Sequence, residues 1–275
     1  MTEIPTITLN NGVAMPQLGF GVFQVPDAET TAAVTSALRA GYRSIDTAAA
    51  YRNEKGVGIA LAESGLKRDE LFVTTKLQNG DQGYDSTLRA FDKSIGALGL
   101  DVVDLYLIHW PMPARDQYLD TWRAFERLYA DGRVRAIGVS NFNPDHLRRL
   151  LDNSEVVPAV NQIELHPFLV QEELRKVDAE LGIATEAWSP LAKGGELLGN
   201  PVVTAIAERL GRTPAQVVLR WHVQLGNVVI PKSVTPSRIV ENLNVFDFEL
   251  GAEDVAALSA LDKGLRTGPD PVRLN

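Results

Sequence analysis

Eight short apolar runs alternate with longer amphipathic segments along this chain, and this alternation restricts the possible folds more than any other feature of the sequence. Most runs are almost continuous in apolar and β-branched residues, as expected for strands buried on both faces of a parallel sheet. Helices between such strands place the chain in the α/β class. The runs are 18–22, 44–48, 71–77, 102–109, 134–140, 159–165, 183–190 and 227–233.

The segments between the runs carry the start and stop signals of helices. One predicted helix ends at Gly41, and another begins at Asn143, which is followed directly by a proline. Thr213 and Gln216 stand in capping-box order, and Thr235 repeats the Thr-Pro start. The sequence therefore predicts a helix after most of the strands.

Eight strand–helix units without a Pro/Gly/Ser-rich linker predict a (β/α)8 TIM barrel that forms one domain over residues 1–275. Asn11-Gly12, between two short apolar runs, predicts an N-terminal β-hairpin with a type I′ turn. A doubly wound open sheet is the alternative fold, and it normally carries a glycine-rich phosphate turn. Gly56 and Gly58 come closest to that turn, but Leu61 stands where its third glycine belongs. The barrel is favoured.

Charge and composition exclude several classes of function. The net charge is −8 without a Lys/Arg block, which argues against nucleic-acid and anionic-membrane partners. The absence of cysteine excludes disulfides, thiolate nucleophiles and cysteine metal sites. The first residues show no secretory signal, and the apolar runs are too short to span a bilayer. We expect a cytoplasmic monomer.

Polar side chains stand at the carboxyl ends of nearly all the predicted strands, where barrel enzymes build their sites. Strand ends also carry polar residues simply because they meet solvent, so each residue alone is a weak signal. The set is Asp46, Lys76, His109, Ser140, Asn141, Gln162, Trp188, Ser189, Lys232 and Ser233.

One group within this set has a chemical logic. Lys76 beside Asp46 can form a buried ion pair, and Tyr51 follows close enough to reach the same place. A phenol near an ammonium is expected to ionise below its usual pKa of about 10, and His109 can donate a hydrogen bond to a substrate oxygen. The group predicts a proton donor and an oxyanion pocket without metal. A structural ion pair, a tyrosine that covers a helix start and a core histidine remain as alternatives.

Several longer motifs resemble the aldo-keto reductase family. The order and spacing of these motifs cover nearly the whole chain, and they are most similar to the bacterial branch that contains the 2,5-diketo-D-gluconate reductases. The motifs are GYRSIDTAAAYRNEKGVG (41–58), KL (76–77), LYLIHWP (105–111), AIGVSNF (136–142), NQIELHP (161–167) and IPKSVTPSRIVENL (230–243).

The resemblance implies that Asp46, Tyr51, Lys76 and His109 form a catalytic tetrad. Tyr51 would protonate the carbonyl oxygen of a substrate, Lys76 held by Asp46 would lower the Tyr51 pKa, and His109 would orient the carbonyl. The family binds NADPH in an extended form across the barrel mouth. This mode of binding explains why the glycine-rich turn is missing.

The resemblance also implies a cofactor site in three parts: a carboxamide contact, a ring that stacks on the nicotinamide, and a pocket for the adenosine 2′-phosphate. The implied contacts are Gly21, Ser140, Asn141, Gln162, Trp188, Ser189, Leu191, Ile230, Lys232, Ser233, Val234, Arg238, Glu241 and Asn242. Two cations, a hydroxyl and a helix N-terminus suit a phosphate dianion. A solvated lysine and a helix-surface arginine are the alternative reading.

The substrate pocket departs from that bacterial branch, because Gln78 stands where an aromatic residue often follows the third strand. Phe20, Phe23 and Trp110 are the expected apolar walls. Residues 192–200 are expected to form a mobile loop over the pyrophosphate, and the tail after Leu261 is short. These features predict an open pocket for small aldehydes, α-dicarbonyls or keto-sugars.

Two other classes of function were weighed against an NADPH-dependent reductase. A metal-dependent barrel hydrolase needs converging histidines or carboxylates, but the chain has four histidines and no His-x-His pair. Glu164 and His166 are therefore expected to be scaffold residues, and no metal is expected. A nicotinamide-binding regulatory or structural barrel without physiological turnover remains the main alternative.

Overall fold

The computed structural model describes residues 4–274, and it places a strand inside each of the eight predicted runs. A two-stranded hairpin, β1 (Thr6–Thr8) and β2 (Ala14–Pro16), precedes them. The eight strands are parallel and adjacent in chain order from β3 to β10. They are β3 (Phe20–Gly21), β4 (Ser44–Asp46), β5 (Phe72–Leu77), β6 (Val103–Ile108), β7 (Val134–Ser140), β8 (Val160–Glu164), β9 (Ala184–Trp188) and β10 (Val228–Val229).

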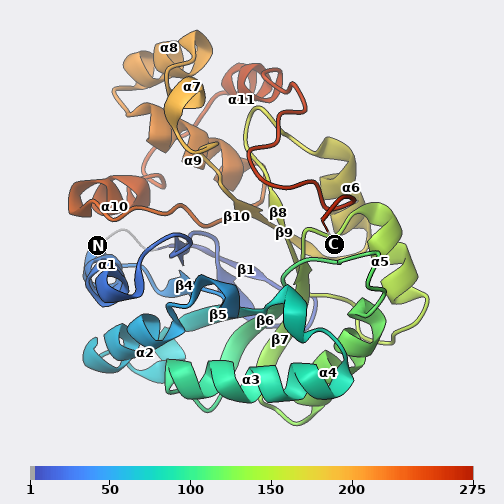
Figure 1. The fold of residues 1–275 in the computed structure, drawn as a ribbon. Coiled ribbons are helices and arrows are strands. Elements are labelled where there is room, and N and C mark those ends of the chain that lie inside the picture. Colours follow the sequence, from blue (N-terminus) through green and yellow to red (C-terminus); the bar gives the residue numbers. More distant parts are fainter. Residues whose placement is uncertain (1–3, 275) are drawn as a thin grey trace.

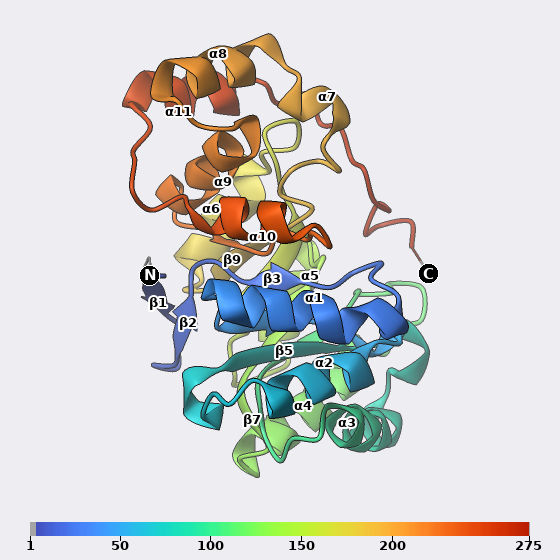
Figure 2. The ribbon, with the colours of Figure 1, turned by 90° about the vertical axis from the view of Figure 1, so that its left-hand side faces the viewer.

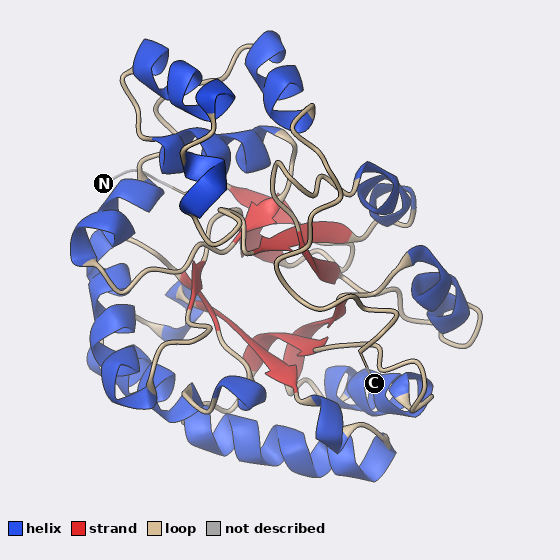
Figure 3. Ribbon diagram, turned by 45° about the horizontal axis from the view of Figure 1, so that its top comes forward, coloured by secondary structure: helices blue, strands red, loops and turns tan. Residues whose placement is uncertain are grey.

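The strands surround a common centre (Figure 3), and the sheet closes on itself between β3 and β10. Leu18 forms a parallel bridge with Val229, and the Gly19 N–H donates to the Val229 carbonyl at 2.9 Å. Gly21 continues this seam, and a Cβ there would lie only 3.2 Å from the carbonyl oxygen of Ile230. The predicted (β/α)8 barrel is confirmed.

The helices surround the barrel (Figure 1), and a quarter turn of the molecule shows α1, α2 and α10 on one side of it (Figure 2). The predicted boundaries at Gly41, Asn143, Thr213 and Thr235 all stand at helix ends. The helices are α1 (Asp27–Ala40), α2 (Glu54–Glu63), α3 (Tyr84–Leu98), α4 (Tyr118–Ala130), α5 (Pro144–Leu151), α6 (Glu172–Glu180), α7 (Gly195–Leu198), α8 (Pro201–Leu210), α9 (Pro214–Gln224), α10 (Pro236–Leu243) and α11 (Ala252–Ser259). The segment 192–200, which was expected to be a loop, contains the single turn α7.

The predicted N-terminal hairpin is present, but the prediction of a type I′ turn is wrong. A type I′ turn needs positive φ at both central residues, whereas only Gly12 has it, at 84°. The Leu9 N–H donates to the Val13 carbonyl and the Gly12 N–H to the Leu9 carbonyl, both at 2.9 Å. The loop therefore has three residues and ends with glycine in the left-handed region.

The hairpin helps to close the amino end of the barrel and leaves the carboxyl end as the open face. Met15 of β2 is fully buried, in a cluster that includes Leu105 and Leu107 of β6 and Val160 of β8. A larger apolar cluster lies between the sheet and the helices.

Backbone strain marks the same open face. Among residues 4–274, every residue other than glycine with positive φ lies in a loop that follows the carboxyl end of a strand. Such conformations are unfavourable and concentrate at functional sites. These residues are Gln24, Arg52, Met112, Asp116, Asn141, Gln171, Ser189, Ala192 and Lys193.

Candidate active site

A buried ammonium lies at the centre of the barrel mouth. Lys76 Nζ, at the carboxyl end of β5, donates to Asp46 Oδ1 of β4 at 2.6 Å and to the Thr47 carbonyl at 2.9 Å. Its third contact is the phenol oxygen of Tyr51 at 3.4 Å, and the Lys76 side chain is fully buried. An ammonium has three protons, so each has a partner. Tyr51 stands in a single 3-10 turn, Ala49–Tyr51, directly after β4.

The charge states of this group follow from burial and from the ion pair. Burial lowers the Lys76 pKa, but Asp46 and then Tyr51 outweigh burial and raise that pKa above its ordinary value, so Lys76 stays protonated. Burial raises the Tyr51 pKa, and Lys76 offsets only part of this effect. The expectation that Tyr51 ionises below its usual pKa is therefore wrong for this cavity. The ammonium limits the rise in the Tyr51 pKa and does not reverse it.

His109 follows β6 and faces the same place. Its ring centroid lies 5.6 Å from that of Tyr51 in an edge-on arrangement. Burial, together with the Lys76 charge, lowers the His109 pKa to about 3. His109 is therefore a neutral imidazole at physiological pH, which can donate a hydrogen bond but is not a proton reservoir. The structure thus brings Asp46, Tyr51, Lys76 and His109 together in one group of contacts, as the sequence predicted.

Aromatic rings extend from Tyr51 and His109 along the mouth. Phe23 is 53% exposed, and its ring centroid lies 5.0 Å from that of Tyr51. The ring centroids of Trp110 and Trp188 lie 6.4 Å apart. Phe20 does not belong to this group, because its ring is buried against Tyr42 among the helices.

The predicted role of Phe20 as a substrate wall is therefore wrong, and strand register explains why. Gly21 pairs with Asp46, whose side chain faces into the barrel, whereas Phe20 pairs with Ile45, which packs in the outer cluster. Successive side chains of a strand point to opposite faces of the sheet. Phe20 therefore points away from the mouth.

The predicted carboxamide contacts lie next to each other, and each already has an internal partner. Asn141 Nδ2 donates to the His109 carbonyl at 2.9 Å, and Asn141 Oδ1 accepts from Trp188 Nε1 at 2.8 Å. Ser140 Oγ donates to the Gln162 carbonyl at 2.7 Å. Asn141 thus holds the Trp188 indole at the rim, and a carboxamide would have to share these bonds.

Glu186 of β9 is part of the site, and the sequence interpretation missed it. Gln162 Nε2 donates to Glu186 Oε2 and to Asp46 Oδ2, both at 2.8 Å. Glu186 is 1% exposed and is the register partner of Gln162 in the sheet. Glu186 is the only charged residue in the run 183–190, and this was the available signal.

The residues predicted for the 2′-phosphate lie at the start of α10. Lys232 and Arg238 are exposed, and no carboxylate among residues 4–274 pairs with either of them. Ser233 is buried and accepts from the Thr235 N–H at 3.1 Å.

The other residues predicted to hold the cofactor lie on α10 or in the segments that follow β9 and β10. Glu241 Oε1 accepts from Thr213 Oγ1 at 2.7 Å, Asn242 is buried and Val234 is 44% exposed. Ser189 and Leu191 follow β9 and are half-buried, and Ile230 lies on the closing seam. These residues thus combine polar and apolar side chains along α10 and the segments after β9 and β10.

Residues 263–268 cross the rim beside β8 and β9. Glu164 accepts from Thr267 Oγ1 at 2.7 Å, from the Gly268 N–H at 3.1 Å, and contacts His166 Nε2 at 3.1 Å. Glu164 is thus a partner of the tail, and His166 contacts Glu164, which agrees with the predicted scaffold role. Among residues 4–274, no group of three or more metal-binding side chains is placed to hold an ion, and no helix is long and apolar enough to cross a membrane.

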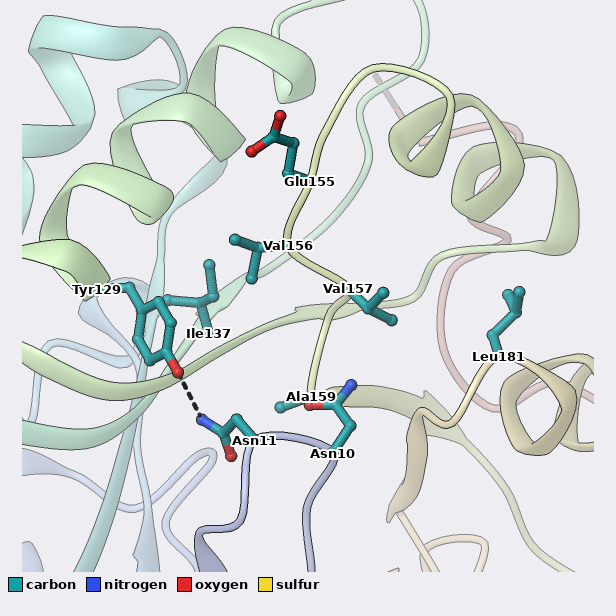
Figure 4. A pocket seen from close by; sticks show the side chains of 9 residues that line it. All are labelled: Asn10, Asn11, Tyr129, Ile137, Glu155, Val156, Val157, Ala159 and Leu181. Atoms are coloured by element: carbon teal, nitrogen blue, oxygen red, sulfur yellow. Dashed lines mark hydrogen bonds between the residues drawn. The ribbon is translucent and has the colours of Figure 1, made fainter.

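Two hollows lie away from this chemistry, at the amino ends of the strands. One, of about 320 Å³, lies between the hairpin loop and β7, where Asn11 Nδ2 donates to the Tyr129 hydroxyl at 3.4 Å (Figure 4). Ala159, just before β8, and Ile137 line it. The other, of about 520 Å³, is lined by Arg43, Phe72 and Arg135. None of the predicted site residues lines either hollow.

A closed (β/α)8 barrel with aspartate, tyrosine, lysine and histidine in its mouth is the arrangement that the sequence resemblance implied. The chain belongs to the aldo/keto reductase family, whose model matches residues 16–263. It is 59% identical over 271 residues to an aldo-keto reductase of Mycolicibacterium smegmatis, with 98% of each chain covered. It is 55% identical over 270 residues to the glyoxal reductase of Bacillus subtilis, with 98% of this chain and 97% of the relative covered. The crystal structure of a Gox0644 variant in complex with NADPH matches with a TM-score of 0.95, 50% identity and full coverage of both chains.

Proposed function

We propose that this protein reduces small aldehydes, α-dicarbonyls or keto-sugars to alcohols, with NADPH as the reductant and Tyr51 as the general acid. One observation carries the proposal. In the hydrogen bond between Lys76 Nζ and the phenol oxygen of Tyr51, at 3.4 Å, Lys76 is the donor and Tyr51 is the acceptor. The hydroxyl proton of Tyr51 is therefore left to point toward the mouth, where His109 also lies.

The chemistry of the residues follows from their charge states. NADPH, when bound, would supply the hydride that reduces the carbonyl carbon. Tyr51 passes its proton to the carbonyl oxygen, and the resulting phenolate is stabilised by the Lys76 ammonium beside it. A phenol remains a much stronger acid than the alcohol that forms, even when burial raises its pKa. Neutral His109 donates a hydrogen bond to the same oxygen and orients the carbonyl.

The residues at the start of α10 fit the adenosine 2′-phosphate of NADPH. Lys232 and Arg238 present two exposed cations, one just before α10 and one in its first turn, and a helix N-terminus also favours an anion. The Trp188 indole, held by Asn141, stands at the rim as the stacking partner for the nicotinamide. These features favour NADPH over NADH.

The open mouth agrees with small, polar substrates. Phe23 is more than half exposed beside Tyr51, and Trp110 lies beside His109 and Trp188. The relative from Bacillus subtilis is a glyoxal reductase, which favours α-dicarbonyls within this class of substrates.

The test is consumption of NADPH by the purified protein against a panel of simple aldehydes, α-dicarbonyls and keto-sugars, with and without a chelator. We expect turnover that the chelator does not change and that is faster with NADPH than with NADH. Tight binding of NADPH without turnover of any member of the panel would favour the alternative, a barrel with a regulatory or structural role. Turnover that the chelator abolishes would favour metal-dependent chemistry.

A further inference from the structure

A buried carboxyl group lies one side chain away from the ion pair, and the mechanism above does not use it. Glu186 is 1% exposed, and its Oε2 accepts from Gln162 Nε2 at 2.8 Å. The same Gln162 nitrogen donates to Asp46 Oδ2 at 2.8 Å, and Asp46 Oδ1 accepts from Lys76 at 2.6 Å. A continuous chain of polar contacts therefore runs from Glu186 to Tyr51.

The buried charges around Glu186 determine whether its carboxyl group is ionised. The charged and titratable groups that act on Glu186 are Asp46 of β4 and Lys76 of β5, and Glu186 in turn acts on Lys76 and on Tyr51. One buried ammonium cannot balance two buried carboxylates. Burial, and then the charge of Asp46, raises the Glu186 pKa to about 8. Glu186 is thus neutral in acid and carries a negative charge in alkali.

We propose that Glu186 is a positioning residue for proton transfer, which acts through Gln162 and Asp46 and whose charge sets how easily Tyr51 releases its proton. The proposal rests on the proposed function of Tyr51 as the acid. While Glu186 is neutral, Asp46 alone balances Lys76, and a Tyr51 phenolate is tolerated best. Once Glu186 ionises, its negative charge disfavours the phenolate and raises the Tyr51 pKa.

The consequence is largest for alcohol oxidation, the reverse reaction, because this direction needs Tyr51 as a phenolate base. At about pH 6, Glu186 is protonated in the native protein and Glu186→Gln is electrically equivalent to it, so both oxidise an alcohol at the same rate. At about pH 10, Glu186 is charged in the native protein only, and Glu186→Gln should oxidise the alcohol roughly threefold faster or more. A residue that only supports the fold would change the rate by one factor at every pH.

The experiment measures the ratio of the two oxidation rates across pH, with Asp178→Asn as a matched control. Asp178 is also a buried carboxyl whose pKa is raised by burial, but it accepts from Asn161 Nδ2 at 3.1 Å and from Thr185 Oγ1 at 3.0 Å and is not bonded to Gln162. The control should give a ratio that does not change with pH. Glu186→Asp, which keeps a carboxyl at the site, should return the ratio toward one at alkaline pH. A ratio for Glu186→Gln that stays constant across pH would overturn the proposal.

A measurement without cofactor or substrate separates this inference from the proposed function. In the protein labelled with 13C at the glutamate carboxyls, the Glu186 resonance is identified by its loss in Glu186→Gln or in Glu186→Asp, so one folded variant is enough. We expect this resonance to titrate at about pH 8 in the native protein. A Glu186 that titrates with the exposed glutamates would sink the inference even if Tyr51 is the acid. Absence of carbonyl reduction with the alkaline titration intact would sink the proposed function alone.

Discussion

The buried pair of Lys76 and Asp46 should show a large coupling energy. When either residue is replaced by a neutral one, the charge of the other stays buried without a partner. The two atoms lie 2.6 Å apart, and the side chains are 0% and 3% exposed. Breaking a buried pair on one side typically costs about 3–5 kcal/mol, so Lys76→Met and Asp46→Asn should each lower the free energy of unfolding by about that amount. The double variant removes both charges. Its loss in free energy of unfolding should be smaller than the sum of the two single losses, by about 2 kcal/mol or more.

The assay is urea unfolding of the four proteins at neutral pH, with equal m-values as the sign that the folded states are comparable. The exposed pair of Arg123 and Asp120, at 2.9 Å, is the matched control, and its cycle should show a coupling close to zero. All three variants of the buried pair should lose carbonyl reduction, because Tyr51 no longer has a stabilised phenolate. Single losses that add to within about 0.5 kcal/mol would refute the view that this pair is held together by mutual charge neutralisation.

Three further outcomes follow from individual contacts. Arg238→Ala should weaken NADPH binding by roughly tenfold or more and leave NADH binding nearly unchanged. Arg89→Ala, which changes an exposed arginine on α3, should alter neither affinity. Equal weakening of both cofactors by Arg238→Ala would rule out the phosphate contact. Gly268→Ala should shift the Trp188 fluorescence and raise KM, because a Cβ at residue 268 would overlap the Trp188 ring. An unchanged spectrum and KM would show that the tail does not contact the indole. Burial raises the Asp178 pKa from 3.8 to about 7, so the folded state holds a proton that the unfolded state loses, and this group should lower the free energy of unfolding increasingly as pH rises from about 4 to about 7. Asp178→Asn should make the free energy of unfolding depend less on pH over this range. An unchanged slope would argue against a buried neutral carboxyl.

The fold was predictable because buried parallel strands leave a strong local signal. Runs such as 71–77 and 102–109 are apolar on both faces, and the caps at Gly41 and Thr213 mark helix ends by local chemistry. The grouping of Asp46, Lys76 and His109 was also accessible, because parallel strands of a barrel bring their carboxyl ends to one face.

What the sequence did not reveal depends on which way a side chain points and on how deeply it is buried. Phe20 was assigned to the mouth because a strand buried on both faces shows no alternation that would separate its inner side from its outer side. Glu186 was missed because its partner Gln162 lies 24 positions away and meets it only through strand register. The Tyr51 pKa was misjudged because desolvation depends on the surrounding atoms, which no spacing rule contains.

The most direct test of the account is single-turnover reduction of an α-dicarbonyl by Tyr51→Phe, with NADPH already bound. The variant keeps the ring that contacts Phe23 and His109 and removes only the hydroxyl beside Lys76. We expect the rate to fall by roughly 10²–10⁴-fold with NADPH affinity unchanged, while Tyr84→Phe, an exposed tyrosine on α3, reduces the substrate at the native rate. A Tyr51→Phe protein that reduces the dicarbonyl within about twofold of the native rate would contradict the central claim that this phenol is the proton donor.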